Sequence, residues 1–328
     1  MALPTELLDH IASFVPHRHL PALASASARL CHVAQRRLFR HIALDARTLR
    51  AVLVLARCPH LARHVRSFAL RIPPDAQLLR AFYLKLQRAL SNMSALTDLD
   101  LSLDHAASWV LCTPHAPVFP RLARFASAFR LDAHVAEFLN KTPALRELEI
   151  DAATPDALRV LRPDALPLLA QFTGASDAAQ LLVPTRPVEH IHLISGDFTE
   201  ELATTLARSA APILVLAAAT SSHSVSLIGT LTRCMDRLVH LRIVTTYNFE
   251  DAPDTSYFAN VADALTSLPD LQSCEIWGVH WISSQKSLHD ERKVWESESF
   301  NTAPIAPNNL LTTGAFLEDL YSDFSFAY

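Results

Sequence analysis

The sequence predicts an α/β fold in which a small N-terminal helical domain leads into an irregular solenoid of strand and helix units. Three observations support this prediction. Apolar residues near the N-terminus have helical spacing, the pattern L-x-x-L-x-L recurs about every 25 residues, and the composition is 50% hydrophobic and 19% charged. A chain of 328 residues with this composition is globular and has room for roughly two domains.

Residues 1–44 are predicted to form two or three short helices. Thr5 is a suitable N-cap, and Pro16 ends the helix that follows it. Helical spacing resumes at Pro21 and continues to His41. So small a bundle cannot bury all of its apolar side chains, and we expect some of them to contact a partner. One face of the first helix carries Leu7, Leu8, Ile11 and Val15.

An apolar repeat follows from residue 45 to residue 278. In a strand, alternate side chains point to the same side, so the last two apolar positions of each copy would be buried together. Helical stretches such as 133–139 and 200–206 lie between copies and would cover that side. The period is within the 20–29 residues of a leucine-rich repeat, which predicts an irregular leucine-rich-repeat-like α/β solenoid. A non-repetitive α/β domain remains the alternative. The second positions of the copies are Phe68, Leu99, Phe125, Leu148, Phe172, Ile191, about 214, Leu241 and Cys274.

Residues 279–328 lack the repeat and are predicted to be a C-terminal cap and loop region. A solenoid needs such a cap over its last unit. The residues expected in a closing helix are Phe316, Leu317, Leu320, Tyr321 and Phe324.

Glycine and cysteine usage excludes several classes of site. The chain has five glycines, and the closest two are 22 residues apart, so motifs that need paired glycines for nucleotide binding or a nucleophile elbow are excluded. The five cysteines include no C-x-x-C pair, which favours reduced thiols in the cytoplasm or the nucleus. We expect neither a signal peptide nor a membrane span, because acidic residues come early and the longest uncharged apolar run is about Ala210 to Ala219.

Charge is distributed unevenly along the chain. Residues 1–72 carry a net charge of +8, whereas residues 73–328 carry −12. This asymmetry indicates that the two ends meet different partners.

The N-terminal residues Leu3-Pro4-Thr5-Glu6-Leu7-Leu8-Asp9-His10-Ile11 resemble the opening of an F-box, L-P-x-E-[IL]-[IL]-x-x-I. The likeness continues through Leu20, Leu23 and the small residues 24–27, and it ends at residues 37–44. The chain is similar to fungal-type F-box proteins with irregular leucine-rich repeats, although Leu30 stands near the place where many F-boxes have tryptophan.

The resemblance implies a substrate-recognition subunit of an SCF-type (Skp–cullin–F-box) ubiquitin ligase, a non-catalytic receptor in ubiquitin-dependent degradation. Its F-box would bind a Skp-family adaptor, and through it a cullin, while the repeats would bind an unknown protein substrate. Two alternatives remain: an interaction scaffold that acts outside a ubiquitin ligase, and an enzyme whose site the sequence does not reveal. The implied adaptor contacts are Leu3, Pro4, Glu6, Leu7, Leu8, Ile11, Leu20 and Leu23.

The strand residues between the buried positions are predicted to face a concave surface. Many of them are acidic, which favours a basic substrate segment. An ordinary solvated face is the alternative. The predicted substrate surface consists of Asp98, Asp100, Glu147, Glu149, Asp151, His190, His192, His240, Arg242, Glu275 and Trp277.

We predict no metal, cofactor or catalytic residue. His190 and His192 place two imidazoles on one strand face, but the sequence identifies no third ligand. His60 and His64 lack the glutamate of the zinc-protease motif, and no serine or cysteine has a recognisable catalytic context. Nucleic-acid binding is not expected either, because the chain as a whole is acidic.

Overall fold

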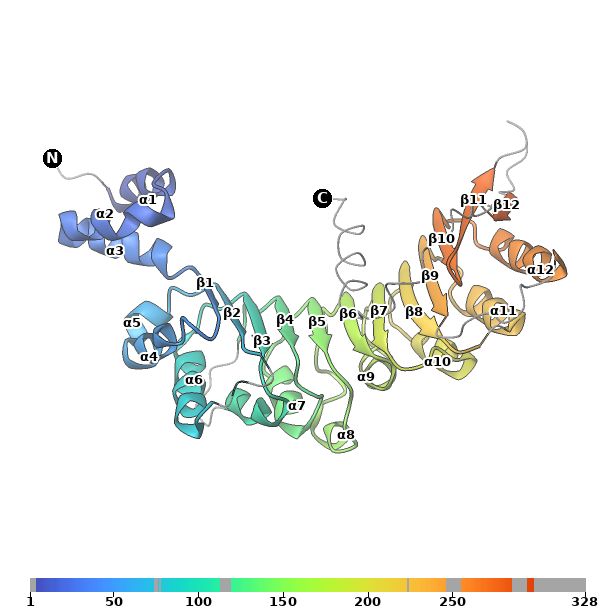
Figure 1. Cartoon of the computed structure of the whole chain (residues 1–328), viewed down its shortest axis with the longest axis horizontal. Helices are drawn as coiled ribbons and strands as arrows, with labels where there is room; N and C mark the ends of the chain where they lie inside the picture. Colours follow the sequence, from blue (N-terminus) through green and yellow to red (C-terminus); the bar gives the residue numbers. More distant parts are fainter. Residues whose placement is uncertain are drawn as a thin grey trace, which may run out of the picture.

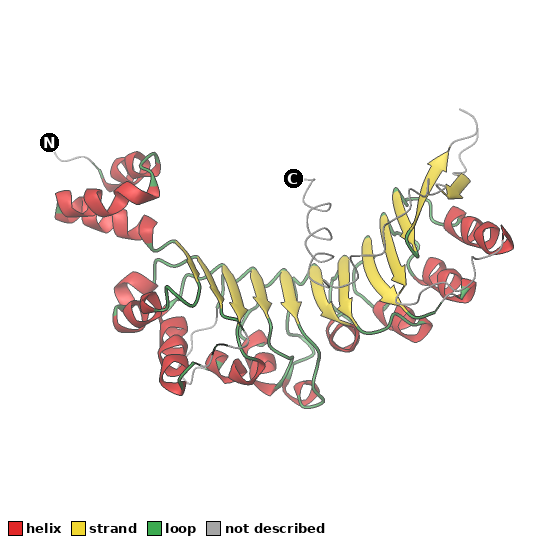
Figure 2. Ribbon diagram, viewed as in Figure 1, coloured by secondary structure: helices red, strands yellow, loops and turns green. Residues whose placement is uncertain are grey.

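A curved sheet with helices along its outer side makes up most of the chain (Figures 1 and 2). The computed structural model describes residues 4–73, 76, 78–112, 119–222, 224–245, 255–284 and 294–297. The fold is mixed α/β, with a 12-stranded sheet whose strands lie side by side in chain order. The pairs from β1 to β10 are parallel, and the last two pairs are antiparallel.

The N-terminal helices form a separate bundle at one end of the sheet (Figure 1). They are α1 (Thr5–Ser13), the 3-10 turn η1 (His17–His19), α2 (Leu20–Ala26) and α3 (Ala28–Leu38). Pro21 lies in the first turn of α2, where its missing N–H costs nothing. The Ser27 hydroxyl caps α3 by accepting a hydrogen bond from the Leu30 N–H at 3.2 Å. The small core of the bundle consists of Ala12, Leu20, Val33 and Ala34.

The predicted helical spacing does not continue to His41. Helix α3 ends at Leu38, and the chain then forms β1 (His41–Leu44), which pairs in parallel with β2 (Ser67–Arg71). Ile42 is the partner of Phe68, so the sheet begins within the segment 1–44. Pairing with a neighbouring strand outweighs the weak local helical pattern here.

The repeat positions identified in the sequence occupy one row across the sheet. The weak copy lies at Leu216 and not at 214, which places it 25 residues from both of its neighbours in the row, Ile191 and Leu241. Leu44, Phe68, Phe125 and Trp295 belong to one continuous core on the helix side. The strands that carry these repeat positions are β2, β3 (Asp98–Ser102), β4 (Arg124–Ser127), β5 (Glu147–Ile150), β6 (Gln171–Ala175), β7 (His190–Ser195), β8 (Val215–Thr220), β9 (His240–Thr245) and β10 (Ser273–Ile276).

Short helices connect consecutive strands and cover the apolar side of the sheet. The helices predicted over 133–139 and 200–206 are confirmed as α7 and α10. Asp132 and Thr199 cap them, accepting hydrogen bonds from backbone N–H groups at 2.9 and 3.2 Å. The connecting helices are α4 (Arg50–Arg57), α5 (Pro59–Ala62), α6 (Arg80–Asn92), η2 (His105–Leu111), α7 (Ala133–Leu139), α8 (Ala157–Val160), α9 (Ser176–Leu182), α10 (Glu200–Leu206), α11 (Val225–Cys234) and α12 (Thr255–Thr266).

The sheet ends in an antiparallel hairpin, which the sequence analysis did not predict. β11 (Val279–Ser284) pairs with β10, and β12 (Val294–Ser297) pairs with β11. The two-residue turn is formed by Trp277 and Gly278, whose φ angles of 53° and 79° are typical of a type I′ turn. Buried tryptophans of β11 and β12 extend the core to the end of the sheet. The proposed closing helix at 316–324 lies outside the described residues.

Candidate functional site: the open face and the first helix

Among the described residues, all helices that connect the strands lie on one face of the sheet, and we call the other face the open face (Figure 2). Burial alternates along the strands: in β3, Leu99 and Leu101 are buried while Asp98 and Asp100 are partly exposed. The registers align the side chains that point to the open face into two rows, some of whose members are buried. The first row is Ser67, Asp98, Arg124, Glu147, Gln171, His190, Val215, His240 and Ser273. The second row is Ala69, Asp100, Ala126, Glu149, Thr173, His192, Ala217, Arg242 and Glu275.

The β2–β5 part of the open face is acidic but partly neutralised. Arg71 lies 2.8 Å from the Asp100 carboxylate, and its hydrogen bond to Asp100 raises the pKa of Arg71. Arg124, which the sequence analysis did not identify, lies 3.6 Å from Glu147. Exposed pairs of this kind stabilise a fold little, by roughly 0–1 kcal/mol. The carboxylates of this part still outnumber the two guanidiniums; they are Asp98, Asp100, Glu147, Glu149 and Asp151.

Asp151 lies apart from the two rows. It follows the last residue of β5, and its carboxylate is 3.9 Å from Nδ1 of His105 in η2. It is therefore at the end of the acidic part, beside a connecting segment.

The β7–β10 part of the open face carries the predicted histidines. His190 and His240 are both paired with Val215 of β8, one on each side, and His192 and Arg242 are both paired with Ala217. Burial, and after it the neighbouring His190, lowers the pKa of both His192 and His240. Arg242 lies 3.0 Å from Glu275. Within the described part of the chain, no group of three or more His, Cys, Asp or Glu side chains could hold a metal ion.

Trp277 is not on the open face, contrary to the prediction. Its positive φ in the hairpin turn breaks the alternation of the strand, and its side chain is only 7% exposed. The ring packs against Tyr257 of α12, with the centroids 5.2 Å apart. Gly278, which follows it, also has a positive φ, as a type I′ turn requires.

The predicted adaptor-binding residues divide into exposed and buried groups. Leu7 and Ile11 are 48% and 50% exposed on α1, and Phe14, just after that helix, is 75% exposed. We call these three residues the α1 stripe. Phe14 was missed because it lies outside the nine-residue motif, although its spacing from Leu7 and Ile11 is helical.

The other predicted adaptor contacts differ from one another in exposure. Pro4 and Glu6 are exposed at the start of α1, and Leu8 and Leu23 are half-buried. Leu20 is only 2% exposed and belongs to the core of the bundle, so it is unavailable to a partner in this conformation. Leu3 lies outside the described residues.

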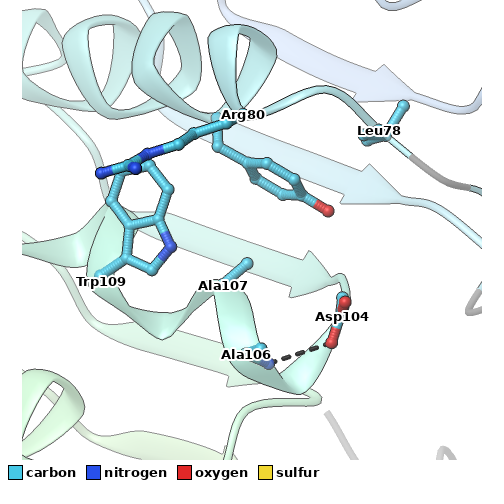
Figure 3. A pocket seen from close by; sticks show the side chains of 7 residues that line it. Leu78, Arg80, Asp104, Ala106, Ala107 and Trp109 are labelled. Carbon is cyan, nitrogen blue, oxygen red and sulfur yellow. Dashed lines mark hydrogen bonds between the residues drawn. The ribbon is translucent and has the colours of Figure 1, made fainter.

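A small pocket lies on the helix side of the sheet, between the start of α6 and η2 (Figure 3). Its volume is about 310 Å³. Arg80 extends beside the Trp109 ring, and the Asp104 carboxylate accepts a hydrogen bond from the Ala106 N–H at 3.0 Å (Figure 3). Burial, and then Asp104, raises the pKa of Tyr83, so this hydroxyl remains protonated. The described lining residues include no serine, cysteine or histidine that could act as a nucleophile or base.

Cys112 lies beside a histidine and a glutamate, as a catalytic thiol often does, but its pKa is raised and not lowered. Its Sγ lies 3.1 Å from Nδ1 of His134 and 3.8 Å from Glu137. Burial, followed by the charge of Glu137, raises the pKa of Cys112 to about 11. A nucleophilic cysteine needs the opposite shift, because the thiolate is the reactive form.

Most of the predicted binding residues lie on two surfaces, the open face and the α1 stripe. They lie on different elements, one on the sheet and one on the N-terminal bundle (Figure 1). None of the described helices is both long and apolar enough to span a membrane. Comparison with known protein families gives no match, and no curated protein matches the sequence.

Proposed function

We propose that this chain is the substrate-recognition subunit of an SCF-type ubiquitin ligase. The bundle of α1–α3 would act as an F-box that binds a Skp-family adaptor, and the adaptor would bind a cullin. The strand and helix units would form a leucine-rich-repeat-like solenoid whose open face holds a protein substrate. The receptor breaks no bond itself. It raises the effective concentration of substrate lysines near the conjugating enzyme.

The observation that carries the proposal is the α1 stripe, which begins within the F-box-like motif of residues 3–11 and continues to Phe14. Leu7, Ile11 and Phe14 are large apolar side chains at helical spacing, and each keeps about half or more of its surface in water. Covering apolar surface contributes about 25 cal/mol per Å², so a partner groove over this helix would gain affinity from all three. The bundle is also rich in arginine, which favours association with an acidic adaptor.

The bundle is held together by its own contacts, separately from the sheet, and this also supports a docking role. Arg36 of α3 lies 3.1 Å from the Asp9 carboxylate of α1, on the same bundle as the exposed stripe. The core of the bundle is separate from that of the sheet, since Leu20 and Val33 lie outside the continuous core. A partner could therefore bind α1 without disturbing the open face.

Co-purification with a Skp-family adaptor tests the proposal. We expect stoichiometric capture by the full chain and loss of capture by the double variant Leu7→Asp/Ile11→Asp. The matched control is Leu79→Asp/Leu84→Asp, which changes two exposed leucines, 79% and 48% exposed, near the start of α6. Capture by the α1 variant, or equal loss in the control, would contradict the proposal. Adaptor capture without cullin in the complex would favour a scaffold outside the ligase.

A further inference from the structure

Helices α4 and α6, on the outer side of the sheet, carry exposed aliphatic side chains. Leu53 and Val54 of α4 are 36% and 41% exposed, and Leu84 of α6 is 48% exposed. Among the side chains that the structure describes on the connecting helices, large aliphatic residues with this exposure occur on α4 and α6 alone. They are grouped on two neighbouring helices and not scattered over the surface, which is typical of a contact surface.

The exposed side of each helix has the same order of side chains. In α4, an aliphatic pair lies one helical turn from an arginine on either side, at positions i, i+3, i+4 and i+7. In α6, the exposed leucine likewise has a cation on either side along the helix. We call this surface the basic helical face. It consists of Arg50, Leu53, Val54 and Arg57 on α4 and of Arg80, Leu84, Lys85 and Arg88 on α6.

The two helices are fixed against each other and against the sheet. They pack side by side near the first strands (Figure 1), and the Asn92 side-chain amide of α6 donates a hydrogen bond to the Leu55 carbonyl of α4 at 3.2 Å. Leu55 and Leu86, on the inner sides of the two helices, belong to the continuous core. The basic helical face is therefore held in place from below, and two packed helices of this kind form a surface on which a third helix can pack.

The positive charge of this region is not balanced. Between Asp45 and Asp98 the sequence has nine lysines and arginines and one acidic residue, Asp75, which lies outside the described residues. The ion pairs of the described residues include none of the cations of the basic helical face. Burial, and after it the charges of Arg63 and Arg36, lowers the pKa of His64, just after α5. Carboxylates brought by a partner would offset the repulsion among these cations.

We infer that the basic helical face binds an amphipathic helix of a partner protein whose apolar stripe is flanked by aspartate and glutamate. The apolar stripe of that helix would cover Leu53, Val54 and Leu84, and its carboxylates would contact the cations around them. A nucleic acid fits less well, because its phosphates have no counterpart for three aliphatic side chains at the centre of the surface. This partner is not the adaptor of the proposed function, whose capture should survive Leu79→Asp/Leu84→Asp.

A fluorescein-labelled helical peptide of about 20 residues is a suitable probe, made of glutamate, alanine and leucine with the leucines at i, i+3, i+4 and i+7. Its binding to the full chain is measured by fluorescence anisotropy. A peptide of the same composition with the leucines scrambled should bind about tenfold more weakly, and equal binding of the two peptides would overturn the inference. Two variants, Leu53→Gln/Leu84→Gln and Arg57→Glu/Lys85→Glu/Arg88→Glu, should each weaken binding of the first peptide by about tenfold.

Each variant has a matched control. Leu168→Gln/Ile194→Gln changes two aliphatic residues elsewhere that are 45% and 47% exposed. Arg121→Glu/Arg159→Glu/Arg208→Glu makes the same change in net charge at exposed positions on other connecting segments. Both controls should bind the peptide as the unmodified chain does. Equal loss in the controls, or unchanged binding by the variants of the basic helical face, would contradict the inference, and thermal melting of all four excludes unfolding as the cause.

Two further measurements separate other occupants and other surfaces. Loss of peptide binding in Leu7→Asp/Ile11→Asp, with normal binding by the variants of α4 and α6, would place the peptide on the α1 stripe and overturn the inference. Sedimentation with vesicles of phosphatidylcholine and phosphatidylserine tests a membrane, and vesicle binding without peptide binding would also overturn it. The adaptor experiment changes only α1, so its failure would count against the proposed function and not against the basic helical face.

Discussion

The guanidinium of Arg242 on β9 lies 3.0 Å from the carboxylate of Glu275 on β10, and the two side chains are only 24% and 20% exposed. Both belong to the open face, yet they are shielded far more than the pair of Arg124 and Glu147, which are 55% and 51% exposed. A shielded charge that loses its partner keeps the cost of its desolvation. The two pairs should therefore differ in what they contribute to stability.

Arg242→Ala should lower the free energy of unfolding by about 1–3 kcal/mol, because it leaves Glu275 largely buried without its partner. Arg124→Ala should change it by about 0–1 kcal/mol, as for an exposed ion pair. Urea unfolding of the two variants tests this difference. The double variant Arg242→Ala/Glu275→Ala should recover part of the loss, and equal effects of the two single variants would contradict the expectation.

The strands could be predicted because the spacing of apolar residues that specifies each strand lies within that strand. Apolar residues three and then two positions apart specify which side chains of a strand are buried, and this spacing located Leu99, Leu148 and Leu241 in one row. Strand β1 has the same spacing at Phe39, Ile42 and Leu44, but the helical pattern before it concealed the copy.

The cross-strand partners could not be predicted, because they are brought together by register and not by spacing. Arg71 and Asp100 are 29 residues apart in sequence but share an ion pair. Arg124 was missed because its repeat copy ends in Ser127 in place of an apolar residue, so the strand around it was only partly recognised. The inward turn of Trp277 depends on one backbone angle, which no pattern of apolar residues encodes.

Reversing charge in the acidic part of the open face tests whether it selects basic segments. The variant Glu147→Lys/Glu149→Lys/Asp151→Lys should weaken binding of a labelled octalysine peptide by tenfold or more, because it adds like charges beside Arg71 and Arg124. The control Asp156→Lys/Asp164→Lys/Glu201→Lys makes the same change in net charge at exposed positions on the connecting segments. Anisotropy titrations compare them, and equal weakening in both would show that net charge alone is responsible.

The stability of the fold should decrease as the pH falls below neutral. Burial lowers the pKa of His192 in the folded chain. As the pH falls below about 6.5, this imidazole therefore becomes protonated in the unfolded chain while it is still neutral in the folded chain. The free energy of unfolding is therefore highest above that pH and decreases as the pH is lowered toward 5.5. In His192→Gln, the melting temperature should depend less on pH over this interval than in His10→Gln, a change at an exposed site. The same dependence of the melting temperature on pH in both variants would contradict the assignment of this effect to His192.

Leu20 and Phe14 should respond in opposite ways to substitution, although both are apolar residues of the N-terminal bundle. Leu20 is 2% exposed, so Leu20→Ala should destabilise the bundle by about 2–5 kcal/mol through a cavity and a lost apolar contact. Phe14 is 75% exposed, so Phe14→Ser should leave stability nearly unchanged but weaken adaptor capture. Hydrogen exchange of residues 5–38 measures the first effect, because the bundle has its own core and can open separately from the sheet. Co-purification with the adaptor measures the second, and normal capture by Phe14→Ser would exclude that ring from the contact.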